Sequence, residues 1–291
     1  MKEILDSAGV EYIQRYREGF LEFDFFIPSC KVGIETHGNY WHSYRKKDFD
    51  LGLVDKERHK KKAIKAVEKG YKLFQFFESE IITKPEIVED MILVNLGFAK
   101  KVFARECKVI ELGKEEFLDF LGKNHLYSPV LCRYKFGLVS GKELVAVVGI
   151  NKTKYGYEIK RIASKRKKVV IGGISKILKF FIKKYKPEGP IRSFLDARFS
   201  SPRKNVLQAI GFDFVQWTPP NYYYIHPKER VTFLRRELFQ KHKLKNILEK
   251  FDPQKSEIEN VLTNGYWIIF DAGHLLYEKI QFKEKNRLGQ D

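Results

Sequence analysis

The sequence predicts a mixed α/β (α+β) protein in which short strands alternate with amphipathic helices. Aromatic and β-branched runs of strand length recur along the chain, for example over residues 71–77. Other segments, such as residues 173–186, carry apolar residues at the helical period. The chain has 291 residues, 43% of them hydrophobic, and only 10 prolines, which predicts two packed domains without long disordered tracts.

The first 104 residues are predicted to form a compact unit. Pro28-Ser29 is a turn signal between two runs rich in aromatic and β-branched residues, which indicates a hairpin. The predicted elements are a helix over 2–14, strands over 22–28 and 31–36, a helix over 55–69, a strand over 71–77 and a helix over 85–96. The basic stretch over residues 100–108 is the expected junction, so the predicted domains are residues 1–104 and 105–291.

Residues 105–291 are predicted to form a second mixed α/β domain with a basic helical extension. Ser140-Gly141 and Tyr155-Gly156 are turn signals within a strand meander, and Pro187 ends a helix. The predicted elements are a helix over 114–122, strands over 133–139, 143–151 and 155–163, a helix over 173–186, a strand over 191–196, a helix over 202–210, strands near 212–217 and 222–226, a helical segment over 228–249 and a final strand pair near 266–278.

The charge of the chain is strongly positive and unevenly distributed. Lys and Arg number 55 against 37 Asp and Glu, a net charge of +18, of which residues 1–104 contribute only +1. Such a basic chain is expected to bind a polyanion, although a solvated, solubilising surface is the alternative. No apolar run is long enough to cross a membrane, and the three cysteines lie far apart, so an intracellular, cytoplasmic protein is expected.

Two carboxylates lie on neighbouring strands of the predicted N-terminal hairpin. Asp24 and Glu35 occupy apolar strands, where an ionised carboxylate is costly to bury unless a cation neutralises it. Across a hairpin they can converge on Mg²⁺ or Mn²⁺. His37 shares the face of Glu35 by strand alternation, and His42 follows among large rings, so both are candidate proton-transfer groups. A single histidine on an aromatic strand is more often a packed residue, but the combination favours a site.

The order of these groups resembles known nucleases. Two carboxylates and then a base, over strand, turn and strand, resemble the PD-(D/E)xK superfamily, with His37 where lysine is usual. The string from Glu35 to His42 resembles the Thr-His-Gly-x-aromatic-Trp-His segment of the very-short-patch repair (Vsr) endonucleases, which nick DNA beside a T·G mismatch. Read from Gly33 to Ser43, it also resembles the phage-encoded homing endonucleases of the EDxHD type.

The resemblance implies a role for each residue of this string. It implies metal ligation by Asp24 and the Thr36 carbonyl, with Glu35 as a further ligand in the homing enzymes. His37 and His42 would then have acid–base or water-orienting roles. The repair enzymes' zinc-binding cysteines have no counterpart, so no zinc is expected.

Two further segments match the phage family. His59 and Lys62 resemble its His-x-x-Lys, and a separation of three places both on one face of the helix predicted over 55–69. Lys62 would stabilise the charge on the scissile phosphate. Glu3 is the candidate for the glutamate of the family's N-terminal helix. A solvated basic helix is the alternative interpretation of residues 55–72.

From about residue 106 the chain is similar to a domain that often follows this nuclease unit in phage proteins. The order of its elements also resembles the GNAT acetyltransferase fold, in which a Gly-rich loop opening a helix holds the pyrophosphate of coenzyme A. That motif needs Arg or Gln three residues before its first glycine and a small residue two after it, whereas Val169 and Ile174 flank Gly172. Acetyl transfer and coenzyme A binding are therefore not expected.

The C-terminal domain carries the residues expected to contact DNA. Residues 152–186 contain thirteen Lys and Arg but a single acid, Glu158, with aromatic residues interleaved. Phosphate contacts that position a protein without reading sequence suit such a segment. The candidate DNA-binding residues are Lys165, Arg166, Lys167, Lys168, Arg198, Arg235 and Arg236.

The sequence is thus interpreted as that of a metal-dependent, site-specific DNA endonuclease that hydrolyses phosphodiester bonds of double-stranded DNA in a phage-infected bacterium. A homodimer is expected if both strands are cut. Three alternatives stay open: a T·G mismatch nickase of the very-short-patch type, a DNA-binding protein with an inactive nuclease core, and an acetyltransferase.

Overall fold

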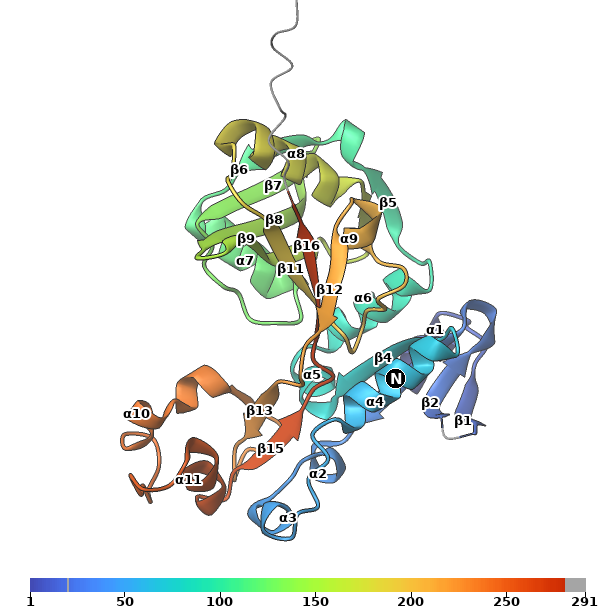
Figure 1. The fold of residues 1–291 in the computed structure, drawn as a ribbon. Coiled ribbons are helices and arrows are strands. Elements are labelled where there is room, and N and C mark those ends of the chain that lie inside the picture. The colour runs from blue at the N-terminus through green and yellow to red at the C-terminus, as the bar shows by residue number, and fades with distance from the viewer. Residues whose placement is uncertain (20, 281–291) are drawn as a thin grey trace, which may run out of the picture. The chain divides into compact units, whose positions relative to one another are not determined.

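The computed structural model describes residues 1–19 and 21–280, and they form a mixed α/β structure, as the sequence predicts (Figure 1). The chain folds into two compact units with discontinuous sequences. Among the described residues, unit 1 comprises Met1–Glu89, Asp196–Arg203 and Trp217–His274, and unit 2 comprises Asp90–Leu195, Lys204–Gln216 and residues 275–280. The domain boundary predicted after residue 104 therefore differs from these bounds, because part of the C-terminal half completes unit 1.

Unit 1 is built on a four-stranded sheet in the order β1-β2-β3-β4. Strands β1 to β3 are antiparallel neighbours, whereas β4 pairs with β3 in parallel. The elements of this part are α1 (Lys2–Ser7), β1 (Ile13–Glu18), β2 (Leu21–Ile27), a 3-10 turn (Pro28–Cys30), β3 (Val32–His37), α2 (Asn39–His42), α3 (Lys46–Asp50), α4 (Arg58–Glu68), β4 (Lys72–Phe77), α5 (Glu78–Thr83) and α6 (Pro85–Asn95). The hairpin, the helix over 55–69, the strand over 71–77 and the helix over 85–96 were thus predicted close to the observed bounds of β2, β3, α4, β4 and α6.

The helix predicted over residues 2–14 is half as long as expected. Helix α1 ends at Ser7, and Gly9 adopts a left-handed conformation with φ of 62°, which ends helices. Ile13, expected on the helix, instead opens strand β1.

The core of this sheet lies under helix α4. The buried residues Leu21, Phe23, Ala66 and Leu73 pack together there. Gly33 allows the close contact between β2 and β3, because a Cβ at this position would lie 2.7 Å from the ring of Phe23. The packing fixes β3 and α4, the two elements that carry most of the predicted site residues.

The C-terminal part of unit 1 is a three-stranded antiparallel sheet with β13 at its centre. Its elements are β13 (Tyr222–Ile225), β14 (Phe233–Arg235), a 3-10 turn (Arg236–Phe239), α10 (Lys241–Leu244), α11 (Glu257–Thr263) and β15 (Trp267–Phe270). The basic helix predicted over 228–249 is therefore wrong, since this segment forms a strand and two single turns. The two strands predicted near 266–278 are present as β15 and β16 (His274–Lys279), but they do not pair with each other, since they belong to different sheets.

Unit 2 contains a seven-stranded sheet in the order β12-β16-β11-β9-β8-β7-β6 and a short parallel pair, β10-β5. Strands β6 to β9 are antiparallel neighbours, and β11 is parallel to β9. The elements are β5 (Lys100–Phe103), a 3-10 turn (Ala104–Glu106), β6 (Lys108–Glu111), α7 (Lys114–Asn124), β7 (Tyr134–Ser140), β8 (Glu143–Thr153), β9 (Gly156–Ser164), β10 (Lys168–Ile171), α8 (Gly173–Tyr185), β11 (Ile191–Asp196), α9 (Val206–Ala209) and β12 (Asp213–Trp217).

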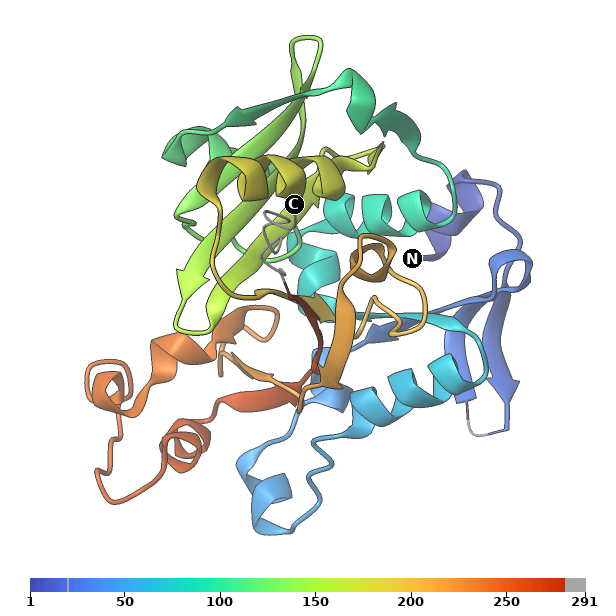
Figure 2. The ribbon, with the colours of Figure 1, turned by 45° about the horizontal axis from the view of Figure 1, so that its top comes forward.

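Helices α7 and α8 cover opposite faces of this sheet. Val147 on β8 packs in the cluster that contains Phe117 of α7. Phe136, which pairs with the next residue of β8, Val148, contacts Phe181 of α8. Successive residues of a strand point to opposite faces, so the two helices lie on opposite sides. Figure 2 shows α8 lying across the strands. No helix among the described residues is both long and apolar enough to span a bilayer.

Candidate functional site

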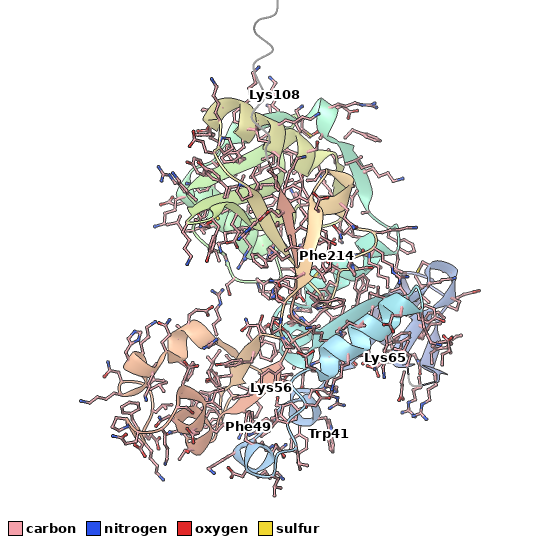
Figure 3. The ribbon with its side chains drawn as sticks, viewed as in Figure 1. Trp41, Phe49, Lys56, Lys65, Lys108 and Phe214 are labelled. Carbon is pink, nitrogen blue, oxygen red and sulfur yellow. The ribbon has the colours of Figure 1, made fainter. Side chains whose placement is uncertain are left out.

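Three histidines from separate elements of unit 1 come together beside the four-stranded sheet. His37 ends β3, His42 ends α2, and His59 lies in the first turn of α4. The ring centroid of His37 lies 4.2 Å from that of His42 and 4.4 Å from that of His59. Trp41, beside His42, points into solvent and is 78% exposed (Figure 3). The structure thus brings together three of the predicted site residues.

Hydrogen bonds from the surrounding residues orient two of these rings. Nδ1 of His59 donates to the backbone carbonyl of Phe270 at 2.6 Å. The Gln75 amide group donates to the backbone carbonyl of His59 at 3.2 Å, and its Oε1 lies 3.1 Å from Nε2 of His37, which donates to it. Nδ1 of His42 lies 2.9 Å from Nε2 of His59. In each of His37 and His59, one nitrogen is therefore occupied; the other nitrogen of His59 faces His42, and that of His37 lies near Glu35.

Burial keeps all three imidazoles neutral. His37 and His59 are only 2% and 4% exposed. Loss of solvation disfavours the charged form and lowers the pKa of His59 to about 4 and that of His42 to about 3. The pKa of His37 is also lowered by burial, and the neighbouring rings of His59 and His42 lower it further. Neutral imidazole carries the free lone pair that proton transfer or metal binding requires.

Glu35 faces the histidines and pairs with Lys62 of α4. Oε1 of Glu35 forms a short hydrogen bond with the Lys62 ammonium, and Oε2 lies 3.8 Å from Nδ1 of His37. Burial raises the pKa of Glu35 to about 7, although the adjacent Lys62 opposes this shift. The structure thus brings Glu35 and His37 of β3 together with His59 and Lys62 of α4.

Asp24 has a different local role. Its Oδ2 accepts hydrogen bonds from the backbone N–H and from the hydroxyl of Thr36, each at 2.7 Å. The register of β2 and β3, in which Phe25 lies opposite Ile34, brings Asp24 to the level of Glu35, and the charge of Asp24 adds to the rise in the pKa of Glu35. Glu3 is exposed in the first turn of α1.

Two residues that build the cluster were not predicted as site residues. Gln75 is a fully buried polar residue in the apolar strand β4, which was a signal available in the sequence. Phe270 contributes only a backbone carbonyl from 211 positions beyond His59, and no local pattern reveals such a contact.

The residues expected to contact DNA lie in both units and have different surroundings. Arg198 is fully buried and paired with Glu80 and Asp196, so it cannot reach a DNA phosphate. The side chains of Lys165 and Lys168 both pair with Glu143, and that of Arg236 lies 3.6 Å from Glu257. For Lys167 and Arg166 it is the backbone N–H that donates, to Asp90 and Asn124 respectively. Arg235 lies on the short strand β14.

A second arrangement with chemical potential lies in unit 2, where β9, β10 and α8 follow one another. The pairing of β8 with β9 shifts between Gly149–Arg161 and Ile150–Ile159, so Lys160 is an extra residue that bulges from β9. The parallel ladder between β9 and β11 ends at this point, with Ile159 opposite Ser193, although both strands continue.

Helix α8 follows from the same end of β9 and begins at two glycines. Gly172 is its N-cap residue, with a left-handed φ of 76°, and Gly173 is its first residue. A Cβ on Gly172 would meet only Ala104, at 3.7 Å, so the approach to the first turn is open there. No acidic residue lies in that turn. Free N–H groups at such a helix start can bind an anion.

Comparisons with known proteins find no protein-family profile and no curated protein that match this chain. Among solved structures, an acetyltransferase from Bacillus subtilis in complex with CoA is 15% identical, covers 60% of this chain and 99% of its own, and has a TM-score of 0.32. A GNAT family acetyltransferase from Elizabethkingia anophelis with acetyl-CoA bound is 11% identical, with the same coverage and TM-score. An alanine N-acetyltransferase of a ribosomal protein from Escherichia coli is 7% identical, covers 63% and 99%, and has a TM-score of 0.33.

These findings contradict the nuclease interpretation of the sequence. The solved structures found are acetyltransferases, not homing endonucleases or very-short-patch repair nucleases, and two of them contain CoA or acetyl-CoA. The expected DNA endonuclease activity, the expected Mg²⁺ or Mn²⁺ cofactor and the double-stranded DNA partner therefore have no support among the proteins found, whose named ligands are CoA and acetyl-CoA, the group that the sequence interpretation excluded. The mismatch nickase and the inactive-nuclease alternatives have no support either.

Proposed function

We propose that unit 2 binds a thioester of coenzyme A and transfers its acyl group to an acceptor. The observation that carries the proposal is the end of the β9–β11 ladder at the Lys160 bulge, next to a helix that begins with Gly172-Gly173. Two kinds of group that can bind coenzyme A therefore lie near each other along the chain: the backbone of the parted strands and the N-terminus of the helix. A GNAT-like arrangement of unit 2 is part of the same proposal.

The backbone of the parted strands suits the pantetheine arm of coenzyme A. This arm carries two amides in an extended chain, which can pair with strand backbone as an added strand does. Beyond Ile159 and Ser193, β9 and β11 no longer pair with each other, so their facing edges are available for such pairing. The bulge at Lys160 turns backbone N–H groups away from the regular ladder, where one can polarise a thioester carbonyl.

The start of α8 suits the diphosphate of the same molecule. Three N–H groups of the first turn, those of Gly173, Ile174 and Ser175, follow the N-cap residue Gly172. The family motif is only partly met: Val169 or Val170 replaces its Arg or Gln, but Ser175 is a small residue two positions after Gly173. Backbone N–H groups and the helix dipole, not a motif side chain, would therefore hold the phosphates.

Calorimetric titration with acetyl-CoA tests the proposal on the full chain. We expect one molecule bound per chain, and Ser175→Glu should weaken binding at least about tenfold, because a carboxylate in the first turn of α8 repels the diphosphate. Ser175→Gln is the matched control of equal size and should bind nearly as the unaltered protein does. Release of the coenzyme A thiol in the presence of amine acceptors would then identify the acceptor.

Two results would overturn the proposal. One is the absence of acetyl-CoA binding by the folded, unaltered chain at millimolar ligand. The other is equal affinity of the Ser175→Glu and Ser175→Gln variants, because the bound molecule would then lie away from α8.

A further inference from the structure

The histidine cluster of unit 1 has no part in the function proposed for unit 2, yet its geometry is that of a ligand set. One nitrogen from each of His37, His42 and His59 lies within 4.8 Å of the corresponding nitrogens of the other two. Two imidazole nitrogens bound to one tetrahedral zinc ion lie about 3.3 Å apart, given Zn–N bonds near 2.0–2.1 Å. The observed 2.9 Å between His42 Nδ1 and His59 Nε2 needs only a small outward shift to reach that separation.

We propose that His37, His42 and His59 bind one transition-metal ion of the zinc type. All three donors are imidazole nitrogens, which suit Zn²⁺, Co²⁺, Ni²⁺ and Cu²⁺, whereas Mg²⁺ and Ca²⁺ prefer oxygen ligands. The wide spacing of the cysteines, which argued against zinc in the sequence, has no bearing on a site built from histidines of three elements.

The hydrogen bonds around the cluster select the ligand nitrogens. His59 Nδ1–H donates to the Phe270 carbonyl, so its Nε2 keeps the lone pair. His37 Nε2–H donates to Gln75 Oε1, so its Nδ1 keeps the lone pair. Metal-binding histidines usually donate their second N–H to a carbonyl or carboxylate in this way, which fixes the ring orientation. Both rings are thus held as ligands before any ion binds.

His42 changes its hydrogen bonding when the ion binds. Without an ion, its Nδ1–H donates to the lone pair of His59 Nε2. Binding through Nδ1 requires the proton of His42 to move to Nε2 of the same ring, so the ring stays neutral and no proton is lost overall. His42 is only partly buried, which gives solvent and the incoming ion access to the cluster from its side.

Glu35 supplies negative charge beside the ligands. Its Oε2 lies 3.8 Å from His37 Nδ1, the nitrogen with the free lone pair. Lys62 holds the other carboxylate oxygen, and Lys62 together with Arg58 adds positive charge around the cluster. The carboxylate therefore offsets part of the repulsion between these cations and a divalent ion.

Titration of the metal-stripped chain with Zn²⁺ and with Co²⁺ tests the site without any activity assay. We expect one ion bound per chain, and bound Co²⁺ should show the intense visible absorption of tetrahedral nitrogen coordination. His42→Gln should weaken binding at least about 100-fold, since a structured site loses one of its ligands. His242→Gln is the matched control, because His242 is exposed on α10 and outside the cluster.

The outcomes separate a metal site from a hydrogen-bonded histidine cluster. A rise in melting temperature with Zn²⁺ in the unaltered chain and in His242→Gln, but not in His42→Gln, supports the proposal. His59→Gln gives a second test from the buried side of the cluster, with folding checked by circular dichroism. No binding by the unaltered chain, or equal binding by His42→Gln and His242→Gln, would overturn it. Neither result depends on coenzyme A.

Discussion

Arg198 shows how a charged residue can be part of the interior of unit 1. Its Nη1 and Nη2 donate to the two carboxylate oxygens of Glu80 at 2.9 and 2.8 Å, and its Nε donates to Asp196 at 3.1 Å. The side chain is fully buried and stacks over Phe77 and Phe199. Two carboxylates on one guanidinium make a planar, bidentate arrangement that lysine could not reproduce.

Replacing Arg198 with methionine is expected to destabilise the protein strongly. The substitution leaves the carboxylates of Glu80 and Asp196 buried without their partner, which costs about 3–5 kcal/mol of unfolding free energy. Arg17→Met is the control, because Arg17 forms an exposed pair with Glu22 that contributes about 0–1 kcal/mol. Urea unfolding measures both, and equal effects of the two substitutions would show that the buried network does not stabilise the fold.

At the residue scale, strand alternation, helical spacing and the resemblance to nucleases singled out the histidines that cluster in the structure. The run that holds His37 and His42, and the helical spacing of His59 and Lys62, pointed to residues that the structure brings together. The same reasoning predicts a metal on Asp24, and the structure shows Thr36 donating two hydrogen bonds to Oδ2 of that carboxylate. A hydrogen bond between neighbouring strands satisfies an acid as well as a cation does, and a sequence pattern does not distinguish them.

At the element scale, strong periodicity predicted the elements well. The helix predicted over 173–186 is α8, whose apolar positions Ile177, Leu178 and Phe181 are buried. The meander of three strands is β7, β8 and β9, nearly at the predicted bounds. In these elements the buried residues are those that the spacing of apolar residues marks, so this spacing was sufficient to predict the elements.

Elements whose pairing depends on distant partners were missed or misassigned. Strand β5 lies in the basic stretch predicted as a junction, and it forms only through parallel pairing with β10, which starts 68 positions later. Strand β14 lies in the predicted basic helix, where pairing with β13 determines its conformation. In such short strands, pairing with a distant strand overrides weak local conformational preferences. The many basic side chains of these segments also made the strands harder to recognise in the sequence.

Gly156, at the turn between β8 and β9, is expected to tolerate no side chain. It has φ of 121°, and a Cβ would lie 2.3 Å from the backbone carbonyl oxygen of Pro190. Gly141, at the turn between β7 and β8, also has a positive φ but open space around it. Gly141→Ala should cost about 1–2 kcal/mol through backbone strain alone, and Gly156→Ala at least about 2 kcal/mol more through the added clash.

Chemical unfolding gives the free energy of unfolding of both variants. The difference between the two values is the cost of the clash at Gly156 beyond the backbone strain that both variants share. The clash would displace Pro190, which precedes β11, and so disturb the start of the β9–β11 ladder. Equal losses for the two variants would mean that the backbone near Pro190 shifts at no cost.

At the scale of the whole molecule, unit 1 depends on segments from both ends of the chain. Phe77 on β4 packs in one cluster with Ile225 of β13 and Ile269 of β15. The backbone N–H of Gln75 donates to the carbonyl of Arg198 at 3.1 Å. The His59 ring is oriented by Phe270. Residues 1–104 therefore lack part of their own core, which charge and composition along the sequence did not reveal.

A chain cut after residue 104 tests this dependence directly. We expect the fragment 1–104 to show no cooperative unfolding transition and to bind a hydrophobic dye, because loss of the cluster around Ile225 and Ile269 exposes Phe77 and loss of Arg198 leaves Glu80 buried and unpaired. Adding the separately produced fragment 105–291 should restore a cooperative transition, since that fragment supplies the missing strands. A cooperative transition from the fragment 1–104 alone would show that the four-stranded sheet and α4 are sufficient for folding, and that the C-terminal segments only add to a unit already stable.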